Sequence, residues 1–237
     1  DVTNYVMREL GHPMHAFDAD KITDQFKIRE AKKGETITTL DKKEYVLQGG
    51  EIVAEDANGE IIDLLGIMGL LNSSVTEETK RVMLFIDNNN SKKIRDASMM
   101  LNIRTDAAIL NEKDVDPELG IKALNRGIQL LTEIANGKLI GDIFDENNKK
   151  EVHKPISVTF QKINDVIGVE ISKKQIEQIL KGLGFTILSS STEIKATPPS
   201  YRAHEIEIPE DIIEEVARMY GYHKIPSILP AMQHVAI

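Results

Sequence analysis

Residues 3–18, "TNYVMRELGHPMHAFD", hold the densest group of side chains that could do chemistry: Asn4, His12, His15 and Asp18. A neutral imidazole can orient a water molecule or exchange a proton near physiological pH. Both histidines also have ordinary explanations. His12 sits in a Gly-x-Pro turn that solvent should reach, and His15 can be a core histidine bonded to a backbone carbonyl. The pattern alone favours these explanations over a site.

Composition narrows the possible chemistry. The 237 residues include no cysteine, which excludes disulfides, thiolate metal sites and a cysteine nucleophile and fits a reducing compartment such as the cytoplasm. A net charge of −9 lacks the basic footprint of nucleic-acid binders, so the chain alone should bind RNA poorly. No apolar run approaches the roughly 18 residues of a membrane span, so no membrane partner is expected. The chain begins at Asp1, and we expect it to be a piece of a longer protein.

The helices and strands expected from the sequence indicate an α+β protein of two domains, 1–149 and 153–230, that would position these residues. The polar stretch 145–155 separates them. The first domain should be a mixed sheet with helices, in which short β-rich runs alternate with turns over 26–66 and Asn58-Gly59 marks a hairpin. Its other expected elements are a helix capped by Asp1 and ended by Gly11, a strand over 81–87, a helix over 91–103, and a helix from Asp116-Pro117 to Gly137.

The second domain should be small, with a helix and hairpin of winged-helix type. Ser172, with Gln175 three residues later, forms a capping box for one helix. The remaining expected elements are a strand over 156–160, a hairpin over 185–200, and a last helix from near Pro209 to Gly221 with Glu210 and Asp211 at its positive end.

Two long motifs resemble a known family. Residues 1–18 look like the opening of the editing module of the bacterial phenylalanyl-tRNA synthetase beta subunit, and "PPSYRAHEIEIPEDIIEEVARMYGYHKIPSILP", 198–230, resembles the signature of the domain that follows it. Between them, "GIMG" at 66–69 and "VDPELGIKALNRG" at 115–127 fall in the family's order. The resemblance covers nearly the whole chain.

The resemblance implies an α2β2 tetramer whose alpha subunit charges tRNA(Phe) with phenylalanine, using ATP and Mg²⁺. ATP would not be bound by this part of the enzyme. The beta-subunit module would accept the 3′ end of tRNA(Phe) and hydrolyse tRNA wrongly charged with tyrosine. An apolar pocket rejects one added hydroxyl by only about a hundredfold, so a second sieve is needed.

The resemblance also assigns roles within residues 1–69. Thr3, Asn4 and His15 fall on positions that line the editing pocket, where an ester hydrolysis needs a held water and donors for an oxyanion. Thr3 is equally explained as a helix cap. Gly66 matches a pocket glycine that lets the substrate approach the backbone, and its alternative is a bend at a strand end. Leu65 replaces a small residue and should narrow the pocket.

Phe85 is the main departure from the family. The family's strand there reads approximately Leu-Glu-Ser-Ala, and the glutamate meets the tyrosine hydroxyl. Here the strand reads Leu-Phe-Ile-Asp. Asp87 would point to the same strand face as Phe85 and could supply the carboxylate, or it is a solvated strand end. Two arginines expected before Asp116 are also absent.

The resemblance implies a magnesium site shared with the alpha subunit. Asp211, Glu214 and Glu215 match it at helix spacing i, i+3 and i+4, and Glu205, with His204 beside it, takes the fourth position. The alternative is an acidic cluster that serves the helix dipole. Two functions therefore compete: hydrolytic editing of Tyr-tRNA(Phe), and a non-catalytic scaffold or tRNA-placing module whose pocket has decayed.

Overall fold

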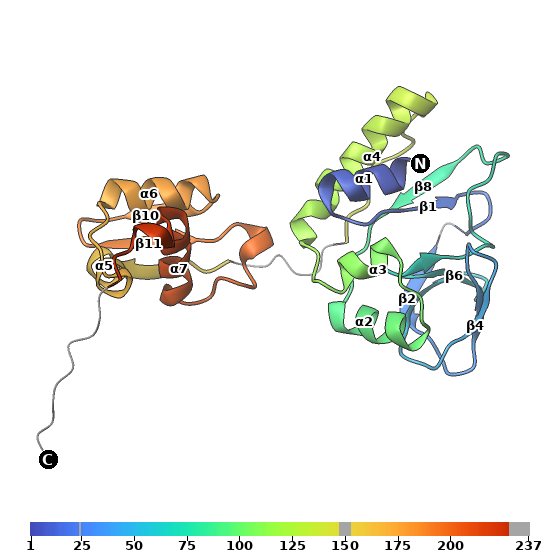
Figure 1. Cartoon of the computed structure of the whole chain (residues 1–237). Helices are drawn as coiled ribbons and strands as arrows, with labels where there is room; N and C mark the ends of the chain where they lie inside the picture. Colours follow the sequence, from blue (N-terminus) through green and yellow to red (C-terminus); the bar gives the residue numbers. More distant parts are fainter. Residues whose placement is uncertain (24, 147–152, 228–237) are drawn as a thin grey trace, which may run out of the picture. The chain divides into compact units, whose positions relative to one another are not determined.

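The computed structural model describes residues 1–23, 25–146 and 153–227 (Figure 1). It divides into two compact units, Asp1–Phe144 and Asp145–Ile237. The predicted ends at 149 and 230, and most of the predicted linker, lie outside the described residues. The α+β class is confirmed, since helices and antiparallel sheets occur in both units.

The first unit contains four α-helices, one 3₁₀ helix and eight strands among its described residues. The helices are α1 (Val2–Leu10), α2 (Ser91–Met100), α3 (Asp106–Asn111) and α4 (Gly120–Ala135), with η1 (Pro117–Leu119) leading into α4. The strands are β1 (His15–Asp18), β2 (Phe26–Glu30), β3 (Thr36–Thr38), β4 (Glu44–Val46), β5 (Ile52–Asp56), β6 (Ile61–Leu64), β7 (Met68–Gly69) and β8 (Val82–Phe85).

These strands form three sheets: the four-stranded sheet β2-β5-β6-β7, the pair β3-β4 and the ribbon β1-β8. Every strand pair among the described residues is antiparallel, whereas a mixed sheet was expected. The predicted hairpin joins β5 to β6, and Gly59 takes the positive φ of 83° that the turn requires. Local turn chemistry therefore predicted this part of the sheet correctly.

The ribbon β1-β8 has one face on the four-stranded sheet and the other toward α4. Phe17 of β1 is fully buried in a cluster with Ala54, Ile62 and Leu65, which brings the ribbon onto the sheet. On the opposite face, a β-carbon on Gly127 of α4 would lie 2.8 Å from Cε of Met14 and 3.3 Å from Cδ1 of Leu84. Helix α4 also lies along α1 (Figure 1).

Local capping explains the helix ends of this unit. The Asp1 side chain accepts a hydrogen bond from the backbone N–H of Asn4, and Gly11 ends α1 with φ 80°. Asp116 caps η1 in the same way. Helix α4 ends at Ala135 because Asn136, not Gly137, adopts the left-handed conformation with φ 52°. Asparagine tolerates that conformation better than most residues, so the predicted end was one residue late.

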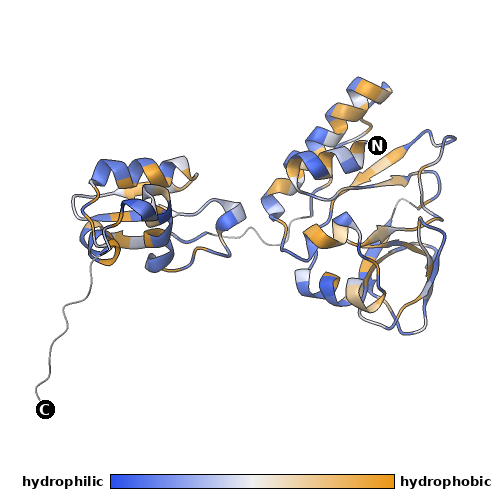
Figure 2. Ribbon diagram, viewed as in Figure 1, coloured by the Kyte–Doolittle hydropathy of each residue, from blue (hydrophilic) through white to orange (hydrophobic). Residues whose placement is uncertain are grey.

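Among its described residues, 153–227, the second unit is a three-stranded antiparallel sheet, in the order β10-β11-β9, with three α-helices. Its core unites residues of all three helices, such as Ile163, Ile176 and Ile212, with Val158 and Ile194 of the sheet. Figure 2 shows these helices divided between a hydrophilic and a hydrophobic side. The elements are β9 (Ile156–Thr159), α5 (Phe160–Ile167), α6 (Lys173–Gly182), β10 (Thr186–Ser189), β11 (Glu193–Thr197), η2 (Ser200–Arg202), α7 (Pro209–Tyr220) and η3 (Tyr222–Lys224).

The expected hairpin, the Ser172 cap and the start of α7 at Pro209 are confirmed. Strand β9 extends the hairpin to three strands, and α5 was not expected. None of the described helices combines the length and the apolar composition needed to cross a membrane.

Candidate functional site

His15 begins strand β1 and packs its imidazole on Gly69 of β7. A β-carbon at Gly69 would lie only 2.3 Å from Cε1 of His15, so only glycine leaves room for the ring. The Nε2 atom of His15 is buried and has no hydrogen-bond partner among the described residues. Burial lowers the pKa of His15 to about 4, which keeps the imidazole neutral at pH 7. The sequence analysis chose Gly66 and missed Gly69, although both stand in "GIMG".

The wall beside His15 is aromatic. His15 lies directly opposite Phe85 in the ribbon, and its ring meets Phe17 edge-on at a centroid distance of 4.5 Å. Phe85 in turn packs on Phe17 at 5.8 Å and on Phe26 at 5.3 Å. Leu65 is fully buried in the same cluster. An apolar surface therefore occupies the place where the resemblance expects a carboxylate.

Gly66 follows β6 at a bend with φ 69°, a backbone conformation that favours glycine. Its α-carbon is covered by the chain's own side chains: a β-carbon would lie 2.8 Å from Nδ2 of Asn89 and 2.9 Å from Cδ1 of Ile94. The Asn111 amide also donates a hydrogen bond to the carbonyl of Gly66 at 3.0 Å. The explanation as a bend therefore accounts for Gly66 without a substrate.

Asp87 does not extend the wall of β8 as expected. The strand ends at Phe85, so the alternation of side chains along a strand does not determine where the Asp87 side chain points. Asp87 is half-buried, and its carboxylate accepts a hydrogen bond from the Asn89 amide. Burial raises the pKa of Asp87, while Asn89 and the charge of His12 oppose that rise. Asp87 is thus a buried acid rather than a solvated strand end.

Two further buried titratable residues lie near Asp87, and the sequence analysis did not recognise them as such. Asp63 of β6 is 4% exposed, and its Oδ1 has no hydrogen-bond partner among the described residues. Burial and then the charge of Asp87 raise the pKa of Asp63 well above its ordinary value. His12 is 1% exposed, with Nδ1 2.8 Å from the carbonyl of Pro13, so the expected solvent-exposed turn is wrong for His12. An aspartate inside the apolar run "EIIDLLG" was the available signal for Asp63.

Thr3 and Asn4 lie in the first turn of α1, where their side chains bond to Asp1. The Thr3 hydroxyl donates to Asp1 at 3.1 Å, and the Asn4 amide donates to it at 2.5 Å. Asn4 is exposed. These contacts belong to the helix cap, and no contact described for either residue reaches His15.

The acids at the start of α7 are bound by the protein itself. The Asp211 carboxylate accepts the backbone N–H groups of Glu207 and Ile208 at 2.8 and 2.9 Å. Glu215 is 4% exposed and pairs with Arg202 at 3.0 Å and with Arg218. Burial alone would raise the pKa of Glu215, but its hydrogen bonds to Arg218 and Arg202 lower the pKa overall.

The other two predicted metal ligands do not complete a cluster. Glu205 also pairs with Arg202, at 2.7 Å, and Glu214 is exposed. No group of three or more histidine, aspartate and glutamate side chains is arranged to hold a metal ion among the described residues. The residues of this chain by themselves do not fit a magnesium ion, because the carboxylates of Asp211, Glu205 and Glu215 already accept hydrogen bonds from the protein.

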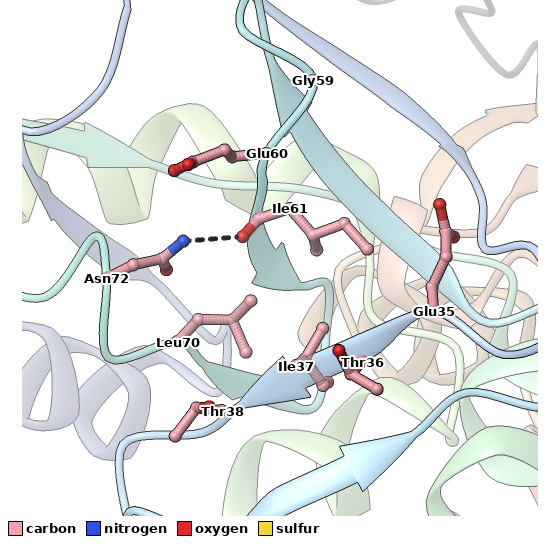
Figure 3. A pocket seen from close by; sticks show the side chains of 9 residues that line it. All are labelled: Glu35, Thr36, Ile37, Thr38, Gly59, Glu60, Ile61, Leu70 and Asn72. Carbon is pink, nitrogen blue, oxygen red and sulfur yellow. Dashed lines mark hydrogen bonds between the residues drawn. The ribbon is translucent and has the colours of Figure 1, made fainter.

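Two pockets in the first unit lie away from His15. One, of about 500 Å³, lies between β3 and the β5-β6 hairpin (Figure 3). In it, the Asn72 amide donates to the carbonyl of Ile61 at 2.9 Å. The other, of about 330 Å³, is lined by residues of α1 and α3 such as Met7 and Leu110. Neither contains a residue that the sequence analysis assigned to the site.

Comparison with known proteins identifies the two units. The B3/4 domain family matches residues 1–136, and the tRNA synthetase B5 domain matches residues 156–222. The phenylalanine–tRNA ligase beta subunit of Psychrobacter arcticus is 42% identical over 235 residues, which is 98% of this chain and 29% of that protein. The subunit of Clostridium acetobutylicum is 37% identical over 99% of this chain and 30% of that protein. The chain therefore spans about three tenths of the length of these relatives.

A crystal structure of an N-terminal fragment of the phenylalanyl-tRNA synthetase beta subunit from Pyrococcus horikoshii is also similar. The similar region covers 93% of this chain and 64% of the Pyrococcus horikoshii chain, with 19% sequence identity and a TM-score of 0.48. The family match extends over more than half of this chain and begins at its first residue. The chain belongs to the B3/4 domain family and, with the B5 domain that follows, corresponds to a segment of phenylalanine–tRNA ligase beta subunits.

Proposed function

We propose that this chain is the editing segment of a phenylalanyl-tRNA synthetase and hydrolyses tRNA(Phe) mischarged with tyrosine. The observation that supports the proposal is the neutral imidazole of His15, held on Gly69 at the end of an aromatic wall. A flat apolar surface suits the ring of a phenylalanine or tyrosine ester, and a neutral imidazole can donate a hydrogen bond beside it.

The proposed reaction is ester hydrolysis. Water forms a bond to the carbonyl carbon, the ester C–O bond breaks, and the products are tyrosine and the free 3′ end of the tRNA. His15 donates a hydrogen bond to the oxygen that gains charge in the tetrahedral intermediate. A pKa of about 4 makes His15 a poor proton acceptor at pH 7, so its role is that of a donor rather than a general base.

The whole enzyme's properties are part of this proposal. They comprise an α2β2 tetramer, ATP-dependent charging of tRNA(Phe) by the alpha subunit, a magnesium ion shared with that subunit, and a cytoplasmic location. The names of the relatives support a beta subunit of a phenylalanine–tRNA ligase, and so a partner subunit. Recognition of the tyrosine hydroxyl by Asp87 also remains a prediction.

A second function, a scaffold that places tRNA without hydrolysing it, is favoured by one specific observation. The polar side chains expected in the pocket are absent or bonded elsewhere. Thr3 and Asn4 donate their side-chain hydrogen bonds to Asp1. Phe85 packs in the aromatic wall at the position where the family has a glutamate. A site without these polar groups would hold a ring and offer a single donor, His15. The two functions therefore predict different rates of Tyr-tRNA(Phe) deacylation.

The deciding experiment is deacylation of Tyr-tRNA(Phe) and Phe-tRNA(Phe) by the reconstituted tetramer. We expect the wild type to exceed spontaneous hydrolysis, with a preference for the tyrosyl ester. His15→Ala should slow deacylation of either ester by roughly a hundredfold, the effect of removing one oxyanion donor. His223→Ala, at an exposed histidine of the second unit, is the matched control and should leave both deacylation rates unchanged. A wild-type rate equal to spontaneous hydrolysis would leave the scaffold as the function.

A further inference from the structure

Asp63 faces the same ribbon that carries His15. In the four-stranded sheet, Asp63 lies directly opposite Ala54 on one side and Gly69 on the other. Directly opposite residues of an antiparallel pair share a face, with β-carbons about 4.5–5.5 Å apart. Ala54 packs with Phe17 beneath the ribbon. The carboxyl of Asp63 therefore points into the interface between sheet and ribbon.

The His15 ring fills the space that a side chain on Gly69 would occupy. The β-carbon position of Gly69 lies 2.3 Å from Cε1 and 3.0 Å from Nε2 of His15. The imidazole thus lies where a side chain on Gly69, the residue opposite Asp63, would lie. The strand register and this packing place the Asp63 carboxyl and the His15 imidazole on the same face of the sheet.

Each of the two groups carries a buried atom that lacks a hydrogen-bond partner among the described residues, Oδ1 of Asp63 and Nε2 of His15. Buried polar atoms are nearly always hydrogen-bonded, because an unpaired one keeps the full cost of its removal from water. No hydrogen bond joins the two atoms in the structure. A rotation of the Asp63 side chain or one bridging water would satisfy both.

The charges around the pair decide which group carries the proton. The charge of Asp87 acts on Asp63, and the charge of His12 acts in turn on Asp87. Burial and the charge of Asp87 favour the protonated form of Asp63, whereas burial keeps His15 unprotonated down to a pKa of about 4. Burial of the two groups therefore favours the acid as the donor and the imidazole nitrogen as the acceptor.

We propose that Asp63 is a positioning residue whose protonated carboxyl donates a hydrogen bond to Nε2 of His15, directly or through one water. Nε2 then accepts, and the ring proton is fixed on Nδ1. The catalytic consequence rests on the proposed editing function: the N–H at Nδ1 becomes the donor that faces the oxyanion. The tautomer itself does not depend on that function.

The test measures the tautomer of His15 by nitrogen NMR of the 237-residue chain labelled at histidine. The His15 resonances are assigned by their loss in His15→Gln. We expect the wild type at pH 7 to carry its ring proton on Nδ1, with Nε2 shifted by an accepted hydrogen bond. Asp63→Asn keeps a donor and should preserve this pattern, whereas Asp63→Ala should move the Nε2 resonance.

The control is Asp56→Asn, in the same sheet. Asp56 is 6% exposed and accepts the backbone N–H groups of Asn58 and Glu60 at 2.9 and 3.0 Å. Asp56→Asn should leave the nitrogen resonances of His15 unchanged. A ring proton on Nε2 in the wild type overturns the proposal, and this outcome needs no variant to fold. Unchanged His15 nitrogens in a folded Asp63→Ala overturn it as well.

A second measurement separates this proposal from the proposed function. In the tetramer, Asp63→Ala should slow deacylation of Tyr-tRNA(Phe) roughly tenfold, the effect of losing one net hydrogen bond, while Asp63→Asn stays near wild type. If the wild-type tetramer does not deacylate at all, the editing function fails while the NMR result still decides the role of Asp63. If it deacylates but His15 carries its proton on Nε2, only the positioning role fails.

Discussion

His15 and Phe85 lie directly opposite each other in the antiparallel ribbon β1-β8, so the imidazole and the phenyl ring share one face. The phenyl ring packs against Phe17 and Phe26, and the imidazole meets the edge of Phe17. A residue at position 85 therefore determines the polarity of the surface next to His15. The resemblance expects a glutamate at this position, and this chain has a phenylalanine there, directly opposite His15.

Phe85→Glu separates stability from activity. It removes an aromatic ring from the cluster and places a carboxylate there, so we expect the first unit to lose roughly 2–4 kcal/mol of unfolding free energy. Phe85→Leu, which stays apolar, should lose about 1 kcal/mol. Calorimetry of the chain measures both. The resemblance to the family predicts that the glutamate raises deacylation of Tyr-tRNA(Phe), and a folded variant without any gain would contradict that expectation.

Gly69→Ala should displace the imidazole. The added β-carbon would sit 2.3 Å from Cε1 of His15, and the burial of the ring leaves little room for it to move. We expect a loss of about 1–3 kcal/mol in unfolding free energy, and shifted His15 nitrogen resonances. The control is Gly182→Ala in α6, where no atom lies within 4 Å and the added methyl should be neutral or slightly stabilising. Equal effects of the two substitutions would show that His15 does not depend on Gly69.

Stability should fall with rising pH because of Asp63 and Asp87. Both have a folded-state pKa above the ordinary value of 3.8. Their contribution to stability is complete below about pH 4 and is lost as the pH rises through the folded-state pKa values, since the unfolded chain releases protons first. Asp63→Asn should flatten the fall in unfolding free energy as the pH rises above 3.8, measured by urea unfolding.

The control for this pH effect is Glu60→Gln, which removes an exposed carboxylate from the β5-β6 hairpin. It should keep the wild-type dependence on pH. A wild-type unfolding free energy that does not fall as the pH rises above 3.8 would mean that the pKa values of the two aspartates are not raised in the folded protein.

Glu215 and Glu214 are adjacent on α7 and should behave differently. Glu215→Ala leaves Arg202 without its buried partner and should destabilise the second unit by about 2–4 kcal/mol, while Glu214→Ala stays within about 0.5 kcal/mol. The lowered pKa of Glu215 adds stability above about pH 4.5, which is lost as the pH falls through the folded-state value. Thermal unfolding at pH 7 and pH 4 measures both effects. Equal losses for the two variants would argue against the ion pair.

The parts of the fold that were predictable from the sequence are those set by local chemistry. Asp1, Ser172 and Pro209 mark helix starts because a cap or a fixed φ acts within one turn. Strand β1 was missed because its four residues form a strand only by pairing with β8 far along the chain. Helix α3 was missed because six residues carry too little periodicity to stand out.

The candidate site was less predictable, because it depends on which faces meet. The chain order of "GIMG" and the strand near 85 suggested a neighbourhood for His15 but not its residues. The strand register places Phe85 opposite His15, and the packing of the imidazole places Gly69 beside it. The burial of Asp63 follows from the ribbon covering the sheet, and the ring of His12 lies beside Gly120 of α4, which no local pattern encodes. The roles of Thr3 and Asn4 remain predictions, since the helix cap explains their contacts.

The ribbon that carries His15 encloses a long stretch of chain, because strands β2 to β7 all lie in sequence between β1 and β8. Joining its two strands closes a large loop, whose entropic cost is compensated only after the intervening sheet has formed. The surroundings of His15 should therefore assemble late in folding. During synthesis, a nascent chain would hold an exposed imidazole without its aromatic wall until residue 85 has left the ribosome.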